Sequence, residues 1–216
     1  MSWYRQGRGG RRSYHHGNLR EALVTAALDL IAAKGPAGFT FAEAARQAGV
    51  SPAAPYRHYR DRDALMADVA RRGFEKFEKQ QAEAWDGGRP TLLQAFERLG
   101  KSYLSFARTE PAYFSAMFES GLSLTEHREL QDAGDRAFGV LRDACEALVS
   151  TIPAGKRPPS MMVALHIWSL SHGIASLFAR GDAARRKLPM DPDDLLEAAT
   201  LIYLEGLGVD LKAGAR

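Results

Sequence analysis

Apolar residues recur every three or four positions along most of this chain, and that period constrains its fold more than any other feature. One clear stripe consists of Leu92, Phe96, Leu99, Tyr103 and Phe106. Such spacing places the apolar side chains on one face of an α-helix. No stretch of four or more residues combines apolar–polar alternation with the β-branched enrichment typical of strands. The pattern predicts an all-α fold of about nine helices.

Breaks in this period divide the chain into three parts. Residues 1–17 are rich in glycine, arginine and histidine and have no apolar period, which is typical of a flexible basic arm. Residues 18–84 contain short helical segments and then one longer connecting helix. Residues 85–216 form a larger helical part, with helices expected at about 124–150, 160–180 and 192–211.

Charge is distributed unevenly along the chain, although the formal net charge is only +3. Residues 1–60 contain nine lysines or arginines and three acids, a net charge of +6, and the remaining residues have a net charge of −3. A basic amino-terminal part on a mildly acidic body indicates a polyanionic partner for the first part only. The alternative is that these charges are simply scattered and solvated.

The chain has one cysteine, Cys145, so no disulfide framework can form within it, which fits a reducing compartment. The first 17 residues lack the apolar stretch of a secretory signal. No apolar run is expected to reach the length that spans a bilayer. These features predict a cytoplasmic protein with no membrane partner.

A short helix is expected to begin at Thr40. Thr40 and Glu43 have the spacing of a capping box, in which each side chain bonds the backbone N–H of the other residue. Gly49 would end this helix, because glycine adopts the left-handed conformation at little cost.

A second short helix is expected after this turn, with Ser51 as its N-cap and Pro52 in its first position. Pro55 removes one of the first internal hydrogen bonds, so the helix should begin with an irregular turn. Two short helices in this order are the layout of a helix-turn-helix, whose second helix enters the DNA major groove. The layout alone is weak evidence, because helical bundles without DNA also contain it.

The side chains of the second helix strengthen that interpretation. Tyr56 and His58 stand beside Arg57 and Arg60. Tyrosine hydroxyls, histidines and backbone N–H groups at helix starts are common phosphate donors. Tyr59 is expected to face inward, but a core position does not account for Tyr56, Arg57 and His58 together.

Residues 39–65, FTFAEAARQAGVSPAAPYRHYRDRDAL, resemble the amino-terminal domain of TetR-type transcriptional regulators. The pattern is a helix, then alanine-glycine-valine-serine, then tyrosine-x-histidine and an aromatic residue, and the resemblance covers about residues 18–75. It implies a helix-turn-helix DNA-binding domain over residues 18–84 and a ligand-binding and dimerisation domain over 85–216. The implied function is sequence-specific transcriptional regulation, by a repressor that a small-molecule effector releases from a double-stranded DNA operator.

The resemblance also implies roles for single residues. Thr40, Tyr56 and His58 would hold phosphates, and Arg62 would do so where the family usually has lysine. The residues that would face base edges are Pro52, Ala53, Ala54 and Arg57. The first three have no hydrogen-bonding side chain, so base readout would depend on Arg57, on methyl contacts to thymine and on DNA shape.

The basic arm has two open interpretations. Arg8, Arg11 and Arg12 could reach a neighbouring minor groove, as basic arms do in other DNA-binding proteins. Alternatively, the arm is disordered and contacts nothing.

Aromatic residues of the carboxyl-terminal part are candidates for an effector pocket. Aromatic residues at helical spacing usually belong to a core, and only the family resemblance makes a cavity an equal alternative. The candidates are Phe96, Tyr103, Phe106, Tyr113, Phe114, Met117, Phe118, Trp168 and His172.

Trp168 and His172 lie on one helix face, and WSLSHG at residues 168–173 is similar to the tryptophan–histidine–glycine signature of one subgroup of these regulators. His172 could meet an anionic or carbonyl-bearing ligand. A hydrogen-bonded core histidine is the alternative.

The helices at about 160–180 and 192–211 mix small and large apolar residues, such as Ala164, Ala175 and Ala198 beside Leu165 and Leu204. Such faces pack closely against other helices. The family resemblance implies that these two helices form a homodimer with isologous contacts.

The sequence also bears on two other classes of function. His166 and His172 are six residues apart and cannot share a helix face for a metal, and the chain has no glycine-rich phosphate loop or nucleophile elbow. An enzyme is therefore disfavoured, and no catalytic residue, metal or cofactor is predicted. A non-specific architectural DNA-binding protein is the other alternative, and the large apolar carboxyl-terminal part disfavours it.

Overall fold

The computed structural model describes residues 19–179 and 190–209. Within these ranges the chain forms eight α-helices, joined by turns and short 3-10 helices, and contains no strand. The predicted all-α fold is confirmed. The predicted basic arm at residues 1–17 lies outside the described residues.

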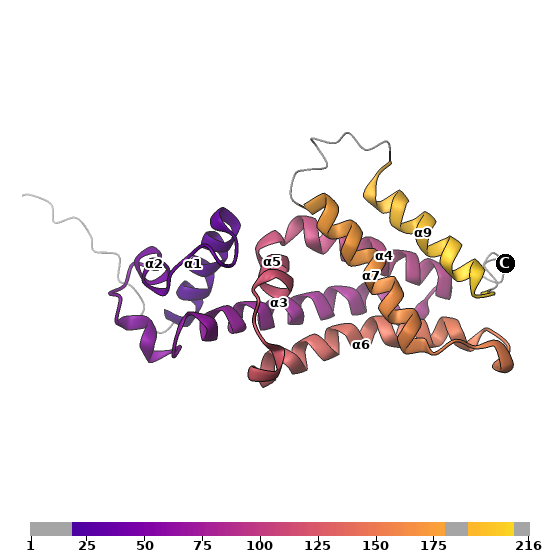
Figure 1. Ribbon diagram of the computed structural model, residues 1–216, viewed down its shortest axis with the longest axis horizontal. Coiled ribbons are helices and arrows are strands. Elements are labelled where there is room, and N and C mark those ends of the chain that lie inside the picture. The colour runs from indigo at the N-terminus through magenta and orange to yellow at the C-terminus, as the bar shows by residue number, and fades with distance from the viewer. Residues whose placement is uncertain (1–18, 180–189, 210–216) are drawn as a thin grey trace, which may run out of the picture.

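A small helical head is formed by α1 (Leu19–Lys34), α2 (Phe41–Gln47), a 3-10 turn η1 (Ala54–Arg57) and the start of α3 (Arg62–Trp85). The head lies at one end of the molecule (Figure 1). Its core consists of one face of α1, the buried alanines of α2 and the first turns of α3.

The helix α3 connects this head to the rest of the protein. Its N-cap is Asp61, whose side chain accepts a hydrogen bond from the Ala64 N–H at 2.8 Å. It ends where Asp86 adopts a left-handed conformation with φ 45°, followed by Gly87 at φ 61°. The expected domain boundary after residue 84 therefore falls at the end of this helix.

The larger part is a bundle of α4 (Leu92–Thr109), α5 (Pro111–Glu119), α6 (Arg128–Ser150), α7 (Ser160–Ala179) and α9 (Pro192–Gly206). Figure 1 shows α6 running along α3, and contacts between the two helices extend over much of their length. The helices α7 and α9 contact each other and α4, at the end of the molecule away from the head.

Two groups of buried side chains hold these parts together. The first continues without a break from α1 through α3 into α5 and α6, so the head and the bundle share one core. The second lies in the distal half of the bundle, where α4, α6, α7 and α9 meet. The shared core fixes α3 between the two parts.

Candidate functional site

The turn between α2 and η1 has the local structure that the sequence predicts at its start. The Thr40 hydroxyl accepts from the Glu43 N–H at 3.2 Å, and the Glu43 carboxylate accepts from the Thr40 N–H at 2.8 Å. The capping box is therefore confirmed. Gly49 has the expected positive φ, at 74°.

The element after this turn is shorter than the predicted helix. Hydrogen bonds run from the Ala54 N–H to the Ser51 carbonyl at 3.0 Å and from the His58 N–H to the Pro55 carbonyl at 2.9 Å, so the turn is a 3-10 helix of four residues. Pro55 is buried in it and has no N–H to continue an α-helical pattern. The recognition element is a single tight turn rather than a regular α-helix.

The side chains of this turn form one exposed surface. Tyr56 is 63% exposed, and its ring meets the edge of Phe41 with centroids 5.0 Å apart. This contact holds the ring while the side chain stays open to solvent. The other predicted DNA-facing residues of the turn are also exposed, except for half-buried Ala54: Pro52, Ala53, Arg57 and His58.

Two more arginines near this turn are exposed, although neither was assigned a DNA contact from the sequence. The side chains of Arg46 on α2 and Arg60 after η1 are 79% and 85% exposed. Arg60 is 2.7 Å from Asp61, and Arg46 is 3.9 Å from Glu43. In the sequence, the only indication of this exposure is that Arg46 and Arg60 fall at polar positions of the two short elements.

Arg62 and Thr40 already have partners within the head. The Arg62 guanidinium donates to the carbonyls of Phe39, at 3.0 Å, and Pro36, and it lies 4.9 Å from the centre of the Phe39 ring. The Thr40 hydroxyl is 3.1 Å from the Glu43 carboxylate. Arg62 thus holds the loop before α2, and a phosphate contact of either residue stays a prediction.

The buried carboxylate of Asp68 joins this turn to α1 and α3. It accepts hydrogen bonds from the Tyr59 hydroxyl at 2.7 Å, Arg71 at 2.6 Å, Arg20 at 3.1 Å and Arg72 at 3.3 Å. Burial raises the pKa of Asp68, but the hydrogen bonds from Tyr59 and the arginines lower it by more, so the net shift is downward. The network ties the end of the recognition turn to the connecting helix.

Asp68 should make the protein sensitive to acid. Its pKa is lower in the folded state than in the unfolded chain. The stability that this difference contributes is therefore fully present above the unfolded pKa, about 3.9, and is lost as the pH falls through the folded value. We expect Asp68→Asn to flatten the acid side of a plot of unfolding free energy against pH, measured by urea titration between about pH 6 and 3. An unchanged slope in the variant would contradict this assignment.

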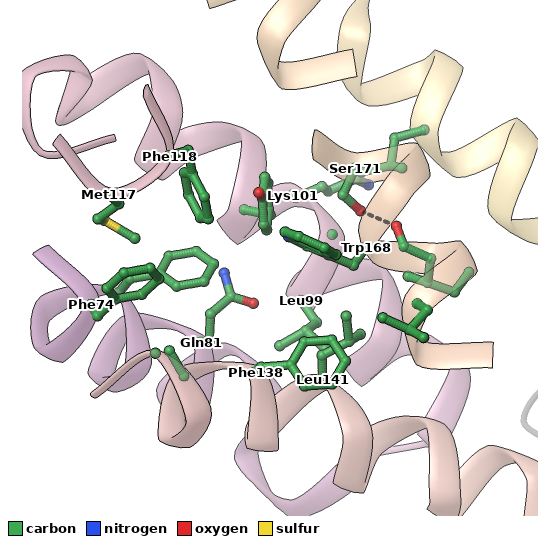
Figure 2. A pocket seen from close by; sticks show the side chains of 18 of the residues that line it. Phe74, Gln81, Leu99, Lys101, Met117, Phe118, Phe138, Leu141, Trp168 and Ser171 are labelled. Atoms are coloured by element: carbon green, nitrogen blue, oxygen red, sulfur yellow. Dashed lines mark hydrogen bonds between the residues drawn. The ribbon is translucent and has the colours of Figure 1, made fainter. Parts of the chain in front are cut away.

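A cavity of about 450 Å³ is lined by residues of α3, α4, α5, α6, α7 and α9. In Figure 2, Phe74, Met117 and Phe118 lie at one end and Leu99, Phe138 and Leu141 at the other. The side chains of Gln81 and Trp168 lie between these two groups. The lining is mostly aromatic and aliphatic, which is typical of a small-molecule site.

Five of the predicted pocket residues line this cavity: Phe96, Tyr103, Met117, Phe118 and Trp168. The other four do not. Phe106 is fully buried against the ring of Phe77, and Tyr113 lies beside the ammonium group of Lys76. Phe114 and His172 stack on each other, with ring centroids 5.5 Å apart.

His172 has the environment of a core histidine. Its Nδ1 lies 3.0 Å from the Tyr103 hydroxyl, and its ring is packed by Phe114, Phe118 and Trp168. Burial lowers the pKa of His172, so the neutral ring is favoured at pH 7.

The cavity also has walls that the sequence analysis missed. Phe74, Phe77 and Gln81 come from α3, the helix that carries Asp68, and Phe138 and Leu141 come from α6. The helical spacing of Phe74 and Phe77 indicates only that these side chains face inward. An inward-facing side chain borders a cavity only where the packed helices are far enough apart. The local apolar period does not predict that distance.

The helices α7 and α9 carry several large apolar side chains that are exposed in the single chain. In the described part of the chain, most of the large exposed apolar side chains lie on these two helices: Met161, Met162, Leu165, Leu177 and Ile202. His166 Nδ1 and the Tyr203 hydroxyl, 2.9 Å apart, link the two helices. These side chains offer a ready contact surface to another apolar face.

The helix α7 corrects one expectation. Residues Ser160–Phe178 are long and apolar enough to span a membrane by length and composition, although no such run was expected. Core helices of globular proteins share this length and composition, so one such helix is weak evidence for a membrane. This helix packs against α4, α6 and α9, and 33% of it is buried in the protein.

Sequence comparisons match two separate stretches of the chain. Residues 23–69 match the profile of bacterial regulatory proteins of the tetR family, and residues 96–202 match the profile of the tetracyclin repressor-like C-terminal domain. The chain belongs to the TetR family. It is therefore a DNA-binding transcriptional regulator of the helix-turn-helix type. The tryptophan–histidine–glycine subgroup stays a prediction, because the matched TetR profile names no subgroup.

Relatives of this TetR-family chain match it over nearly their full length. The uncharacterized HTH-type transcriptional regulator YobS of Bacillus subtilis (strain 168) is 25% identical over 203 residues, which cover 91% of this chain and 96% of YobS. A solved protein of unknown function from Rhodococcus sp. RHA1 is 27% identical, covers 91% of this chain and 98% of its own, and has a TM-score of 0.74. The fatty acid degradation regulator FadR from Bacillus halodurans shares the fold, with 12% identity, coverage of 87% and 95%, and a TM-score of 0.67.

Proposed function

We propose that this TetR-family regulator is a cytoplasmic homodimeric repressor that binds a specific operator and leaves it when a small molecule occupies the cavity. The observation that carries the proposal is the course of α3. Its first turns adjoin the recognition turn through Asp68 and Tyr59, and Phe74, Phe77 and Gln81 farther along the same helix line the cavity. One helix therefore belongs to both sites.

We assign DNA binding to residues 18–84. Tyr56 and His58 are exposed and carry groups that bond phosphate oxygens, and Thr40 stands at the start of α2. The exposed Arg46 and Arg60 add positive charge to this part of the chain, which would strengthen binding to any DNA sequence. Sequence preference then rests on Arg57 and on the small apolar surface of Pro52, Ala53 and Ala54.

We assign ligand binding and dimerisation to residues 85–216. The exposed apolar side chains of α7 and α9 favour a second copy of this chain as their partner, through the isologous contact that two-fold dimers use. Two recognition turns would then meet half-sites about 34–36 Å apart, one turn of DNA.

The ligand would act by favouring one of two arrangements of α3, since it cannot touch DNA from the cavity. A small tilt of α3 moves the recognition turn, because the Asp68 network fixes that turn to the helix. The spacing between the two turns of a dimer would then no longer match the operator. Coupling of about 1–3 kcal/mol would change operator affinity about 5- to 150-fold.

The alternatives predict different behaviour. An architectural protein would bind all DNA with similar affinity and would need no cavity. A role as an enzyme has no support from the family, whose members named among the relatives are regulators.

Substitutions in the recognition turn test the DNA-binding assignment. Tyr56→Phe and His58→Ala should each weaken binding about tenfold, the loss of one hydrogen bond to a charged group. Because phosphates carry no sequence information, the loss should be equal for operator and random DNA. The measurement is fluorescence anisotropy with a sequence selected from a random pool and with a scrambled duplex.

The control is Arg142→Ala, which removes an exposed arginine from α6, away from the head. It should leave both affinities unchanged. A variant at Tyr56 or His58 that altered sequence preference while keeping overall affinity would show that these residues read bases instead.

A further inference from the structure

The charged side chains around the cavity are unbalanced. Among the described residues, four carboxylates line it, those of Glu97, Asp135, Asp193 and Glu197, and a single base, Lys101. Lys101 is already paired with Glu197 at 3.1 Å. This hydrogen bond raises the pKa of Lys101, so the side chain stays protonated and its charge is paired with that of Glu197.

The remaining carboxylates have fewer partners. Arg108 pairs with Asp193 at 3.2 Å. Among the described residues, neither Glu97 nor Asp135 has a hydrogen bond or ion pair. Glu97 lies close enough to Lys101 to interact with it electrostatically, and Asp135 is exposed to solvent. The described part of the lining therefore offers no unpaired cation to an incoming molecule, and its carboxylates outnumber its bases.

The polar groups deeper in the cavity are engaged within the protein. Ser171 donates to the Ile167 carbonyl at 2.9 Å, and the Tyr103 hydroxyl is 3.0 Å from His172. With its amide oriented to satisfy both ends, Gln81 donates to the Leu99 carbonyl at 3.3 Å and accepts from the Tyr103 N–H at 3.1 Å. A molecule inside would be held chiefly by the apolar side chains.

We infer that the effector is an uncharged, mostly aromatic or aliphatic molecule, and that the lining discriminates against an anion of the same shape. This inference rests on the proposed role of the cavity as the effector site. A carboxylate, sulfonate or phosphate would lose its hydration in the cavity without gaining a cation, which is strongly unfavourable. A volume of about 450 Å³ accommodates a molecule of two or three rings and lies within the usual range of ligand pockets.

Two dyes with the same ring system test the charge preference. N-phenyl-1-naphthylamine is neutral, and 8-anilinonaphthalene-1-sulfonate adds one sulfonate. Both become fluorescent in apolar surroundings, so each can be titrated into the full-length protein without DNA. We expect the neutral dye to bind at least about tenfold more tightly, since one uncompensated charge outweighs the unchanged ring contacts.

Two variants locate the dye and its charge preference. A side chain built at Gly134 on α6 would point toward the ring of Phe74, 3.8 Å from the Cβ position. Gly134→Leu should therefore fill the cavity and abolish binding of the neutral dye. Gln131→Leu, one helical turn earlier and not in the lining, should leave binding unchanged.

The double variant Glu97→Gln/Asp135→Asn should raise affinity for the sulfonate several-fold and leave that for the neutral dye unchanged. Equal or tighter binding of the sulfonate by the natural sequence would overturn the inference. So would retention of the neutral dye by a folded Gly134→Leu variant. Because these titrations contain no DNA, a failure of operator binding would count against the proposed function and would not alter their result.

Discussion

Ile202→Glu should convert the proposed dimer into monomers at micromolar concentration. Ile202 lies on α9 and is 71% exposed in the single chain, so the substitution should leave the protomer fold intact. In an isologous dimer the new carboxylate would be buried once in each copy. The desolvation of each unpaired charge costs several kcal/mol, which is enough to lower the association constant about 1,000-fold or more.

Sedimentation velocity measures the oligomeric state directly. Operator affinity of the same sample should decrease as the dimer is lost, because a monomer can bind only one half-site. Leu177→Glu on α7, at a position 60% exposed, should have the same effect. The control is Ala82→Glu, which places the same acid at an exposed position of α3. Dimers that survive both substitutions on α7 and α9 would mean that another surface mediates assembly.

Asp68→Asn should lower the free energy of unfolding by about 3 kcal/mol, because removing one partner of a buried ion pair leaves the others uncompensated. This loss of unfolding free energy lies at the lower end of the usual range, because two of the arginines retain other partners in the variant. Arg72 still pairs with Glu21 at 2.6 Å, and Arg71 still pairs with Glu75. For a chain of this length we expect the midpoint of thermal unfolding to fall by about 6–12 °C.

Tyr59→Phe is the matched control for this substitution. It removes one hydrogen bond to Asp68 and keeps the buried ring, so the loss should be about half as large or less. Its informative readout is operator affinity in the folded protein, which should fall because the recognition turn is no longer fixed to α3. If Asp68→Asn were as stable as the natural sequence, the network would not hold the head together.

Local patterns predicted the fold well. The capping box at Thr40 and the positive φ of Gly49 depend on neighbouring residues only, and both are found. The all-α class followed from the apolar period for the same reason. The length of the recognition element was harder to predict. Pro55 indicates that the turn is irregular, but it does not indicate where the helix ends.

Contacts between distant residues account for what the sequence analysis missed. Arg62 bonds carbonyls that lie 23 and 26 residues earlier in the chain, and Arg20 reaches Asp68 across 48 residues. Asp68 did leave a signal, as an acid within the apolar run from Leu65 to Val69. Such an acid indicates a buried ion pair, but its partners emerge only when the helices are packed.

The continuous core from α1 to α6 has a consequence for engineered sensors. The end of α3 looks like a convenient junction at which to exchange the DNA-binding heads of two regulators. A head cut there would lose the apolar surface of α5 and α6 on which α1 and the middle of α3 rest. A working chimera of this protein must therefore transplant or redesign that contact surface together with the head.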